Sequence, residues 1–126
     1  MAQSDIRQYE VTAASTAVFG RVLCGARNHH FIVDGPAQNG CPGEEVTPPE
    51  IFLAGVASCG VELMHVLAKS SEIPVKTINV GITATMDRSK PVRPDVTIFN
   101  SVRINFRISG VSDQQARQLI TAFKGR

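Results

Sequence analysis

The chain has 126 residues, a hydrophobic fraction of 43%, a charged fraction of 19% and a formal net charge of +2. This length suits one domain that can bury a core, and the composition argues against a disordered chain. The mild charge balance argues against an electrostatic partner such as nucleic acid or a membrane surface. We therefore expect a soluble globular protein formed by a single domain over residues 1–126.

The cellular setting is predicted from the ends and the cysteines. The Met1–Ser4 start lacks the basic and apolar segments of a secretory signal, and no apolar run is expected to reach membrane-spanning length. Three cysteines, an odd number, do not form a disulfide framework. The expected location is the cytoplasm, with no membrane partner.

Strands are expected in the first quarter of the chain. Residues 9–14 and roughly 18–34 have the pattern of two or three strands, with Gly20 and Gly25 as turn or bulge points. The segment 35–47 that follows is dense in glycine and proline. A loop of about 12 residues is long for a compact domain, and such loops often carry function.

A helix is expected to follow this loop. Thr47 can cap it, Pro48 suits its first position, and Glu50 completes a capping box three residues after the cap. The apolar residues continue to about Ser71 and cover most of the circumference, which predicts a central helix buried on most sides.

The remaining elements complete the fold class. Residues 75–86 and 96–108 alternate apolar and polar side chains with period two, as half-buried antiparallel strands do. The Asp87–Pro94 segment joins them as a hairpin loop, and Ser112 caps a last amphipathic helix. The order β-β(-β)-α-β-β-α predicts an α+β fold with a buried central helix and a second helix on antiparallel sheets.

Cys59 lies inside the central helix, either as a packed structural thiol or as a redox nucleophile. A peroxidatic thiol must react as the thiolate, and burial in an apolar helix raises its pKa. Since Cys59 is about three turns into the helix, the helix dipole cannot compensate, and an arginine from elsewhere must do so. Glu50 could orient that arginine through a bidentate contact, although capping is a sufficient structural role for it.

Other polar residues are given less specific roles. Cys24 lies in an expected strand and is interpreted as a core residue. Adjacent His29 and His30 point to opposite faces of a strand, so a metal site with Cys41 is not expected, and neither is a cofactor. Glu62 and His65, one helical turn apart, are interpreted as a buried polar pair or a dimer contact rather than a catalytic base. The glycine-rich loop lacks the lysine of a phosphate cradle.

The helix motif Pro48-x-Glu50-x-x-x-Ala54-x-x-x-x-Cys59 follows Val33-Asp-Gly-Pro36 and Gly40-Cys-Pro-Gly43. Together, in this order, these motifs resemble the OsmC/Ohr family, named after osmotically induced protein C and organic hydroperoxide resistance protein. The resemblance extends from about Arg27 to Arg126, because the downstream β-β-α order also fits. It implies an intertwined homodimer with two central helices at its heart, and cysteine-based reduction of organic hydroperoxides.

The resemblance also implies roles for individual residues. Cys59 falls on the reactive cysteine, and Glu50 lies near the family's glutamate. The activating arginine of the N-terminal strands could be Arg21 or Arg27. Glu50 precedes Cys59 by nine residues where ten are usual, which rotates its direction by about 100° on a helix.

A second cysteine usually follows the last helix in this family. We expect this chain to lack that cysteine segment and the last strand, so an external thiol would resolve the oxidised Cys59. Cys41 is a less favoured internal substitute. Two functions remain open: thiol-dependent reduction of organic hydroperoxides through Cys59, or a non-peroxidase dimer that binds a small apolar ligand at its interface.

Overall fold

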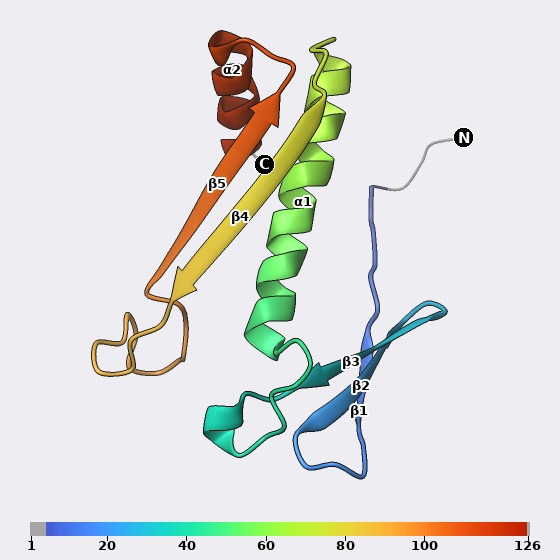
Figure 1. Cartoon of the computed structure of the whole chain (residues 1–126), viewed down its shortest axis with the longest axis vertical. Helices are drawn as coiled ribbons and strands as arrows, with labels where there is room; N and C mark the ends of the chain where they lie inside the picture. Colours follow the sequence, from blue (N-terminus) through green and yellow to red (C-terminus); the bar gives the residue numbers. More distant parts are fainter. Residues whose placement is uncertain (1–4, 126) are drawn as a thin grey trace. The chain divides into compact units, whose positions relative to one another are not determined.

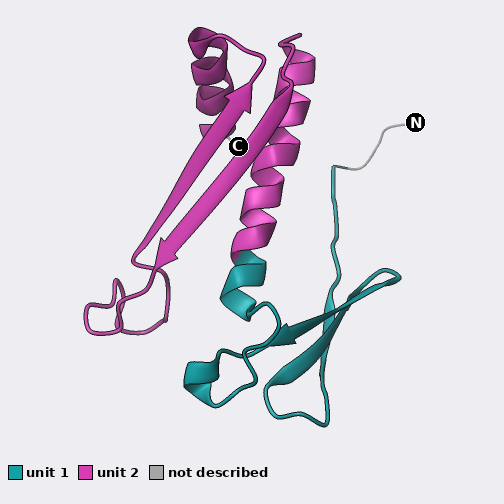
Figure 2. Cartoon of the chain, in the orientation of Figure 1, with its two compact units in different colours: residues 1–52 teal, residues 53–126 magenta. Residues whose placement is uncertain are grey.

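A computed structural model describes residues 5–125 of the chain. It contains two antiparallel sheets and two α-helices, so the predicted α+β class and element order are confirmed. The chain divides into two compact units, residues 1–52 and 53–126 (Figure 2). The elements in chain order are β1 (Thr12–Ser15), β2 (Arg21–Ala26), β3 (His29–Asp34), the short 3-10 helix η1 (Ala37–Asn39), α1 (Pro48–Ser70), β4 (Thr77–Thr85), β5 (Ser101–Ser109) and α2 (Asp113–Lys124) (Figure 1).

Unit 1 is built on a three-stranded antiparallel sheet with the order β1-β2-β3. The chain turns between β2 and β3 at residues 27–28, where Arg27 has a φ of 54°. Gly25, an expected turn or bulge point, instead lies inside β2 opposite Thr12 and His30. The two-residue turn at 27–28 sets the register of the β2–β3 hairpin and places Arg21 directly opposite Asp34.

The segment between β3 and α1 has structure of its own. It contains η1, and Gly40 ends this short helix with a φ of 79°, a conformation that favours glycine. The Gly35 N–H donates to the Gly20 carbonyl at 2.8 Å, and the Gly43 N–H donates to the Gly35 carbonyl at 3.1 Å. The glycine-rich segment is therefore fastened to the end of the sheet.

The start of α1 follows the predicted signals in part. The Thr47 carbonyl accepts from the Ile51 N–H at 2.9 Å, so the helix begins after Thr47 as expected. The Glu50 carboxylate accepts from the Thr47 N–H at 2.9 Å and from the Thr47 hydroxyl at 2.7 Å. The hydroxyl thus turns to the carboxylate instead of capping the helix. Both bonds hold the pKa of Glu50 below its usual value.

The expectation that α1 is buried on most sides is wrong for the chain by itself. Its buried residues are confined to one stripe, Gly60, Met64, Leu67 and Ala68. Phe52 is 63% exposed and Val66 49% exposed, although both are apolar. In unit 2, one face of the β4–β5 sheet and the helix α2 pack against α1. Together they cover a single stripe of its surface.

The prediction that no apolar segment is long enough to span a membrane is also wrong, because α1 is long enough. Within residues 5–125, α1 is the one helix that is long and apolar enough to cross a membrane, judged by its length of 23 residues and its composition. The core helix of a soluble protein meets the same criteria. Met64, Leu67 and Ala68 do lie in the core of unit 2.

The core of unit 2 lies between α1, α2 and one face of the β4–β5 sheet. The register pairs Ile78 with Ile108 and Val80 with Phe106, so the predicted even-numbered residues share a face. Leu119 of α2 is 1% exposed, and the Phe106 and Phe123 rings meet edge to face at 5.1 Å. α2 begins with the complete capping box of Ser112 and Gln115, which confirms the predicted cap.

The fifth strand is shorter than predicted, because residues 96–100 belong to the connecting loop. The side chain of Asn100 ends the pairing between β4 and β5. Its Oδ1 accepts from the Asp87 N–H at 2.7 Å, and its Nδ2 donates to the Lys90 carbonyl at 2.6 Å. The amide therefore closes the loop and leaves Val96 and Ile98 exposed beyond the strand.

Candidate functional site

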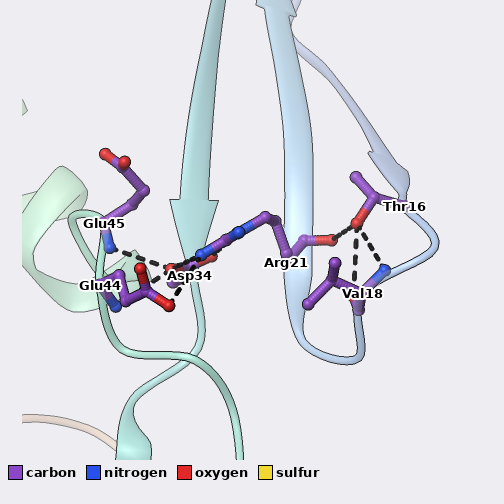
Figure 3. A network of polar contacts seen from close by, with 6 residues as sticks. All are labelled: Thr16, Val18, Arg21, Asp34, Glu44 and Glu45. Carbon is purple, nitrogen blue, oxygen red and sulfur yellow. Dashed lines mark hydrogen bonds and ion pairs between the residues drawn. The ribbon is translucent and has the colours of Figure 1, made fainter.

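A polar cluster joins the end of β3 to the start of β2 in unit 1. Arg21 and Asp34 face each other across the hairpin, and their side chains form a bidentate pair (Figure 3). Nε of Arg21 lies 2.8 Å from Oδ1 of Asp34, and Nη2 lies 2.9 Å from Oδ2. Such fork-to-carboxylate geometry fixes the plane of the guanidinium as well as its position.

The Asp34 carboxylate is the centre of this cluster. Its side chain is fully buried, and Oδ2 also accepts from the backbone N–H groups of Glu44 at 3.1 Å and Glu45 at 3.0 Å (Figure 3). The hydrogen bonds from Arg21, with those from Glu45 and Glu44, outweigh the cost of burial and hold the pKa of Asp34 well below its usual range. Asp34 thus binds both the sheet and the loop that leads to α1.

The Arg21 guanidinium has a second, weaker carboxylate neighbour. Nη2 lies 3.7 Å from Oε1 of Glu44, whose side chain is 77% exposed. The hydrogen bond with Asp34 is the main cause that raises the pKa of Arg21 above its ordinary value. The Arg21 side chain is 27% exposed, and its Nε and Nη2 atoms are the ones that bind Asp34. One cation thus faces two carboxylates, so the cluster offers directed N–H donors rather than net positive charge.

A bidentate contact between an arginine and a carboxylate is present at Asp34, and the contact predicted between Glu50 and an activating arginine stays a prediction. Asp34 holds Arg21, whereas Glu50 bonds to Thr47 at the start of α1. Asp34 was not among the predicted site residues. A turn at residues 27–28 places positions 21 and 34 opposite each other, so recognising this turn in the sequence would have identified Asp34 as the partner of Arg21. The turn lacks the asparagine-glycine pair that usually reveals a hairpin, so the register could not be read.

The two candidate arginines have different surroundings. Arg27 is exposed in the turn between β2 and β3. Arg21 is half-buried at the base of the same hairpin, and its guanidinium is held by Asp34. The geometry therefore distinguishes two residues that the sequence left equivalent.

Cys41 is packed next to this cluster. A Cβ atom added to Gly20 or to Gly35 would lie 2.4 Å from the Cys41 Sγ. These glycines are the chain neighbours of Arg21 and Asp34. The Cys41 thiol therefore fills a slot that only two residues without side chains leave open.

Cys59 lies in unit 2, on the part of α1 that continues from unit 1. Gly60 beside it is buried, and a Cβ atom there would be 3.5 Å from Cε1 of Phe106. This close approach directs the Gly60 stripe toward the sheet. Of the three cysteines, Cys59 alone is exposed, so its expected burial is wrong for the single chain. Glu62 and His65 are exposed too, which corrects their interpretation as a buried pair.

Cys24, on β2, is half-buried rather than a fully enclosed core residue. Within residues 5–125, no group of three or more His, Cys, Asp or Glu side chains is placed to hold a metal ion. A hollow of about 870 Å³ opens in unit 1 where the N-terminal segment passes the β2–β3 turn. It is lined by Gln8, Tyr9, Glu10, Val11, Thr12, Gly25, Ala26, Arg27 and His30.

Comparisons with known proteins agree with this architecture. A family model described as OsmC-like protein matches residues 41–126, a segment that includes Cys41, Glu50 and Cys59. The crystal structure of an OsmC-like protein from Mycoplasma pneumoniae has a TM-score of 0.81 at 16% identity, covering 95% of this chain and 82% of that one.

Two further solved structures share the fold. An organic hydroperoxide resistance protein from Legionella pneumophila has a TM-score of 0.72 at 16% identity, covering 94% of this chain and 82% of that one. The organic hydroperoxide resistance protein OhrB of Bacillus subtilis has a TM-score of 0.58 at 20% identity, covering 92% and 82%. No curated protein matches the chain by sequence. At these identities the likeness concerns the fold.

Proposed function

This chain belongs to the OsmC-like protein family, and we propose that it is a cytoplasmic homodimer that reduces organic hydroperoxides to alcohols through Cys59. The observation that carries the proposal is Cys59 itself, the one exposed thiol of the three, on a long helix within the family-matched segment. The names of the Legionella pneumophila and Bacillus subtilis proteins support the hydroperoxide as substrate class.

The proposed reaction has two halves. The Cys59 thiolate attacks the terminal oxygen of R–O–OH, the O–O bond breaks, and the alkoxide takes up a proton to leave as the alcohol. Cys59 becomes a sulfenic acid, and the hydroperoxide is reduced by two electrons. Two equivalents of an external thiol then restore the Cys59 thiol and release water and a disulfide.

Thiolate formation requires a donor or a positive charge near the sulfur. We propose Arg21 rather than Arg27 for this role, because the Arg21 guanidinium is held in one orientation by Asp34, whereas Arg27 is exposed in the turn between β2 and β3. Glu50 stays a predicted site residue. The contacts of its carboxylate with Thr47 support a role in starting α1.

The exposure of apolar residues supports the proposed homodimer. Val33 is the one buried apolar side chain among the described residues of unit 1. Small sheets need a covered face for stability, and α1 leaves Phe52 and Val66 in solvent. A second copy of the chain would cover such surfaces, and a covered site with apolar walls would favour a hydroperoxide with an apolar tail over hydrogen peroxide. Sedimentation at micromolar concentration should give twice the mass of the chain.

The test of the activity is a single oxidation. Protein is mixed with one equivalent of cumene hydroperoxide, and the oxidation of each cysteine is measured by mass spectrometry. We expect Cys59 to be oxidised before Cys24 and Cys41, and Cys59→Ser to abolish the loss of peroxide. Cys24→Ser is the matched control, since it also removes one thiol. Cys59 reacting no faster than Cys24 would refute the proposed function, and equal rates with hydrogen peroxide would refute the substrate preference.

The alternative is a non-peroxidase dimer that binds a small apolar ligand. The hollow beside Tyr9 and Val11 favours it, because about 870 Å³ is a common size for ligand sites. A fluorescent apolar probe such as anilinonaphthalene sulfonate would bind equally well to the native protein and to Cys59→Ser under this alternative. An inert Cys59 together with saturable probe binding would favour it over the peroxidase.

A further inference from the structure

We propose that the hollow in unit 1 is a binding site for a small monocarboxylic acid with an apolar body. Its lining residues all lie between positions 8 and 30, outside the segment 41–126 that the family model matches. The site does not depend on the reaction at Cys59. It gives a ligand class to the hollow that the alternative function uses, and it applies equally if Cys59 is a peroxidase nucleophile.

The backbone at Gly25 forms the floor of this hollow. Gly25 lies in the middle strand of the sheet, directly opposite Thr12 of β1 and His30 of β3. Residues that are directly opposite in paired strands place their side chains on the same face of a sheet. A Cβ atom added at Gly25 would lie 3.3 Å from the Thr12 Oγ1 and 3.5 Å from the His30 Cδ2, so these two side chains flank bare backbone.

The backbone conformation of Gly25 does not require a glycine. Gly20, Gly40, Gly43 and Gly110 have positive φ angles, and Gly25 does not. A glycine inside a strand costs stability and packs no side chain, and it often marks a place where a ligand approaches the backbone closely. The hollow above Gly25 therefore suits a flat part of a ligand that lies against the sheet.

Arg27 lines the hollow from the turn between β2 and β3, at a strained position. Its φ of 54° lies in the left-handed region, which glycine adopts readily and arginine does not. A glycine would relieve the strain of this turn, so what the arginine contributes is its side chain. A guanidinium is permanently charged and forms paired hydrogen bonds with a carboxylate. Arg27 therefore selects an acid as the ligand.

The other lining groups limit the charge of the ligand and receive its apolar body. The Thr12 hydroxyl and the His30 imidazole can donate further hydrogen bonds to a carboxylate. Glu10 also lines the hollow, and its negative charge opposes a doubly charged ligand such as a phosphate. Tyr9 is 85% exposed and Val11 64% exposed, and they provide apolar surface beside these groups. The volume of about 870 Å³ is within the usual range for small-molecule sites.

Two probes with the same apolar body test the site: naphthylacetate, a monocarboxylate, and naphthylacetamide, its neutral counterpart. Binding of each probe to the whole chain is measured by isothermal titration calorimetry. We expect the wild type to bind naphthylacetate saturably and about 10-fold more tightly than naphthylacetamide, because hydrogen bonds to a charged group add about that factor. Cys59→Ser should bind both probes like the wild type.

Two variants separate the carboxylate contact from the floor. Arg27→Gly should weaken naphthylacetate binding about 10-fold and leave naphthylacetamide binding unchanged. It should not lower the urea midpoint, because glycine relieves the left-handed strain. Gly25→Ala should weaken both probes by a similar factor, because its methyl group occupies the floor.

Matched controls come from unit 2. Gly81→Ala also adds a methyl group to a strand glycine, and an added Cβ atom there meets nothing within 4 Å. Arg103→Gln removes an exposed arginine from β5. Both controls should bind the two probes like the wild type. In the hollow itself, Glu10→Gln removes the opposing charge and should tighten the binding of naphthylacetate but not of naphthylacetamide.

Four results would each overturn the inference: no saturable binding of naphthylacetate by the wild type, equal affinities for the two probes, unchanged binding in Arg27→Gly, or unchanged binding in Gly25→Ala. A second copy of the chain that fills the hollow would overturn it too, and sedimentation would reveal this as a halved mass in Gly25→Ala. Failure of the proposed peroxidase is a separate result, because an inert Cys59 in the oxidation assay changes none of these affinities.

Discussion

The slot occupied by Cys41 permits a quantitative prediction. In Gly35→Ala, the new Cβ atom would lie 2.4 Å from the Cys41 Sγ and 2.9 Å from its Cβ. Unstrained contacts between such atoms lie at about 3.5 to 4.0 Å, so the overlap exceeds about 1 Å with the sulfur. Gly35 has no left-handed φ, and the penalty is therefore one of packing alone. Overpacking of this kind costs about 1–3 kcal/mol.

The same geometry predicts how the loss is repaired. Cys41→Ala removes the sulfur but leaves the 2.9 Å contact, so it should restore part of the stability of Gly35→Ala. Cys41→Gly removes both contacts and should restore more. Gly55→Ala is the control, because an added Cβ there meets nothing within 4 Å and should stabilise α1 by about 0.5–1 kcal/mol.

The measurement is urea unfolding followed by circular dichroism at one fixed protein concentration, since a dimer's midpoint depends on concentration. With a slope of about 2 kcal/mol per molar urea, the Gly35→Ala midpoint should fall by about 0.5–1.5 M. An unchanged midpoint would refute the reasoning. So would a loss that neither Cys41 substitution reduces, because the cost would then have another origin.

Two further predictions concern stability. The pKa of Asp34 is lowered on folding, so the ionised carboxylate stabilises the fold fully above its unfolded pKa of about 3.9. This stabilisation is lost as the pH falls toward the folded pKa. The urea midpoint of the wild type should therefore drop below about pH 5, and it should drop less steeply in Asp34→Asn. An equal drop in the variant would contradict this assignment. Leu119→Ala should cost about 2–5 kcal/mol because the side chain is 1% exposed in the core of unit 2. Thermal unfolding would measure this, with exposed Val102→Ala as the control, and equal losses in the two variants would count against the described core.

Burial was the weakest part of the sequence interpretation. The apolar residues of α1 cover most of its circumference, which predicted a helix enclosed on most sides. The chain covers one stripe, and Phe52, Cys59 and Val66 remain exposed. The hydrophobic pattern of a helix indicates which of its faces are buried in the final assembly. It does not indicate whether the same chain or a partner chain buries them. For this reason Cys59 was predicted to be buried and is found in solvent.

The elements of this fold were determined by local signals within the sequence. The period-two strands, the Ser112 capping box and the start of α1 after Thr47 depend on residues at most a few positions apart, and the structure contains all of them. The organisation of the candidate site was decided by tertiary structure. Arg21 and Asp34 are 13 residues apart, and they meet because an inconspicuous two-residue turn sets the hairpin register. That register pairs Arg21 with Asp34, and only the pairing of β2 with β3 could reveal it, because the two residues are not neighbours in the sequence.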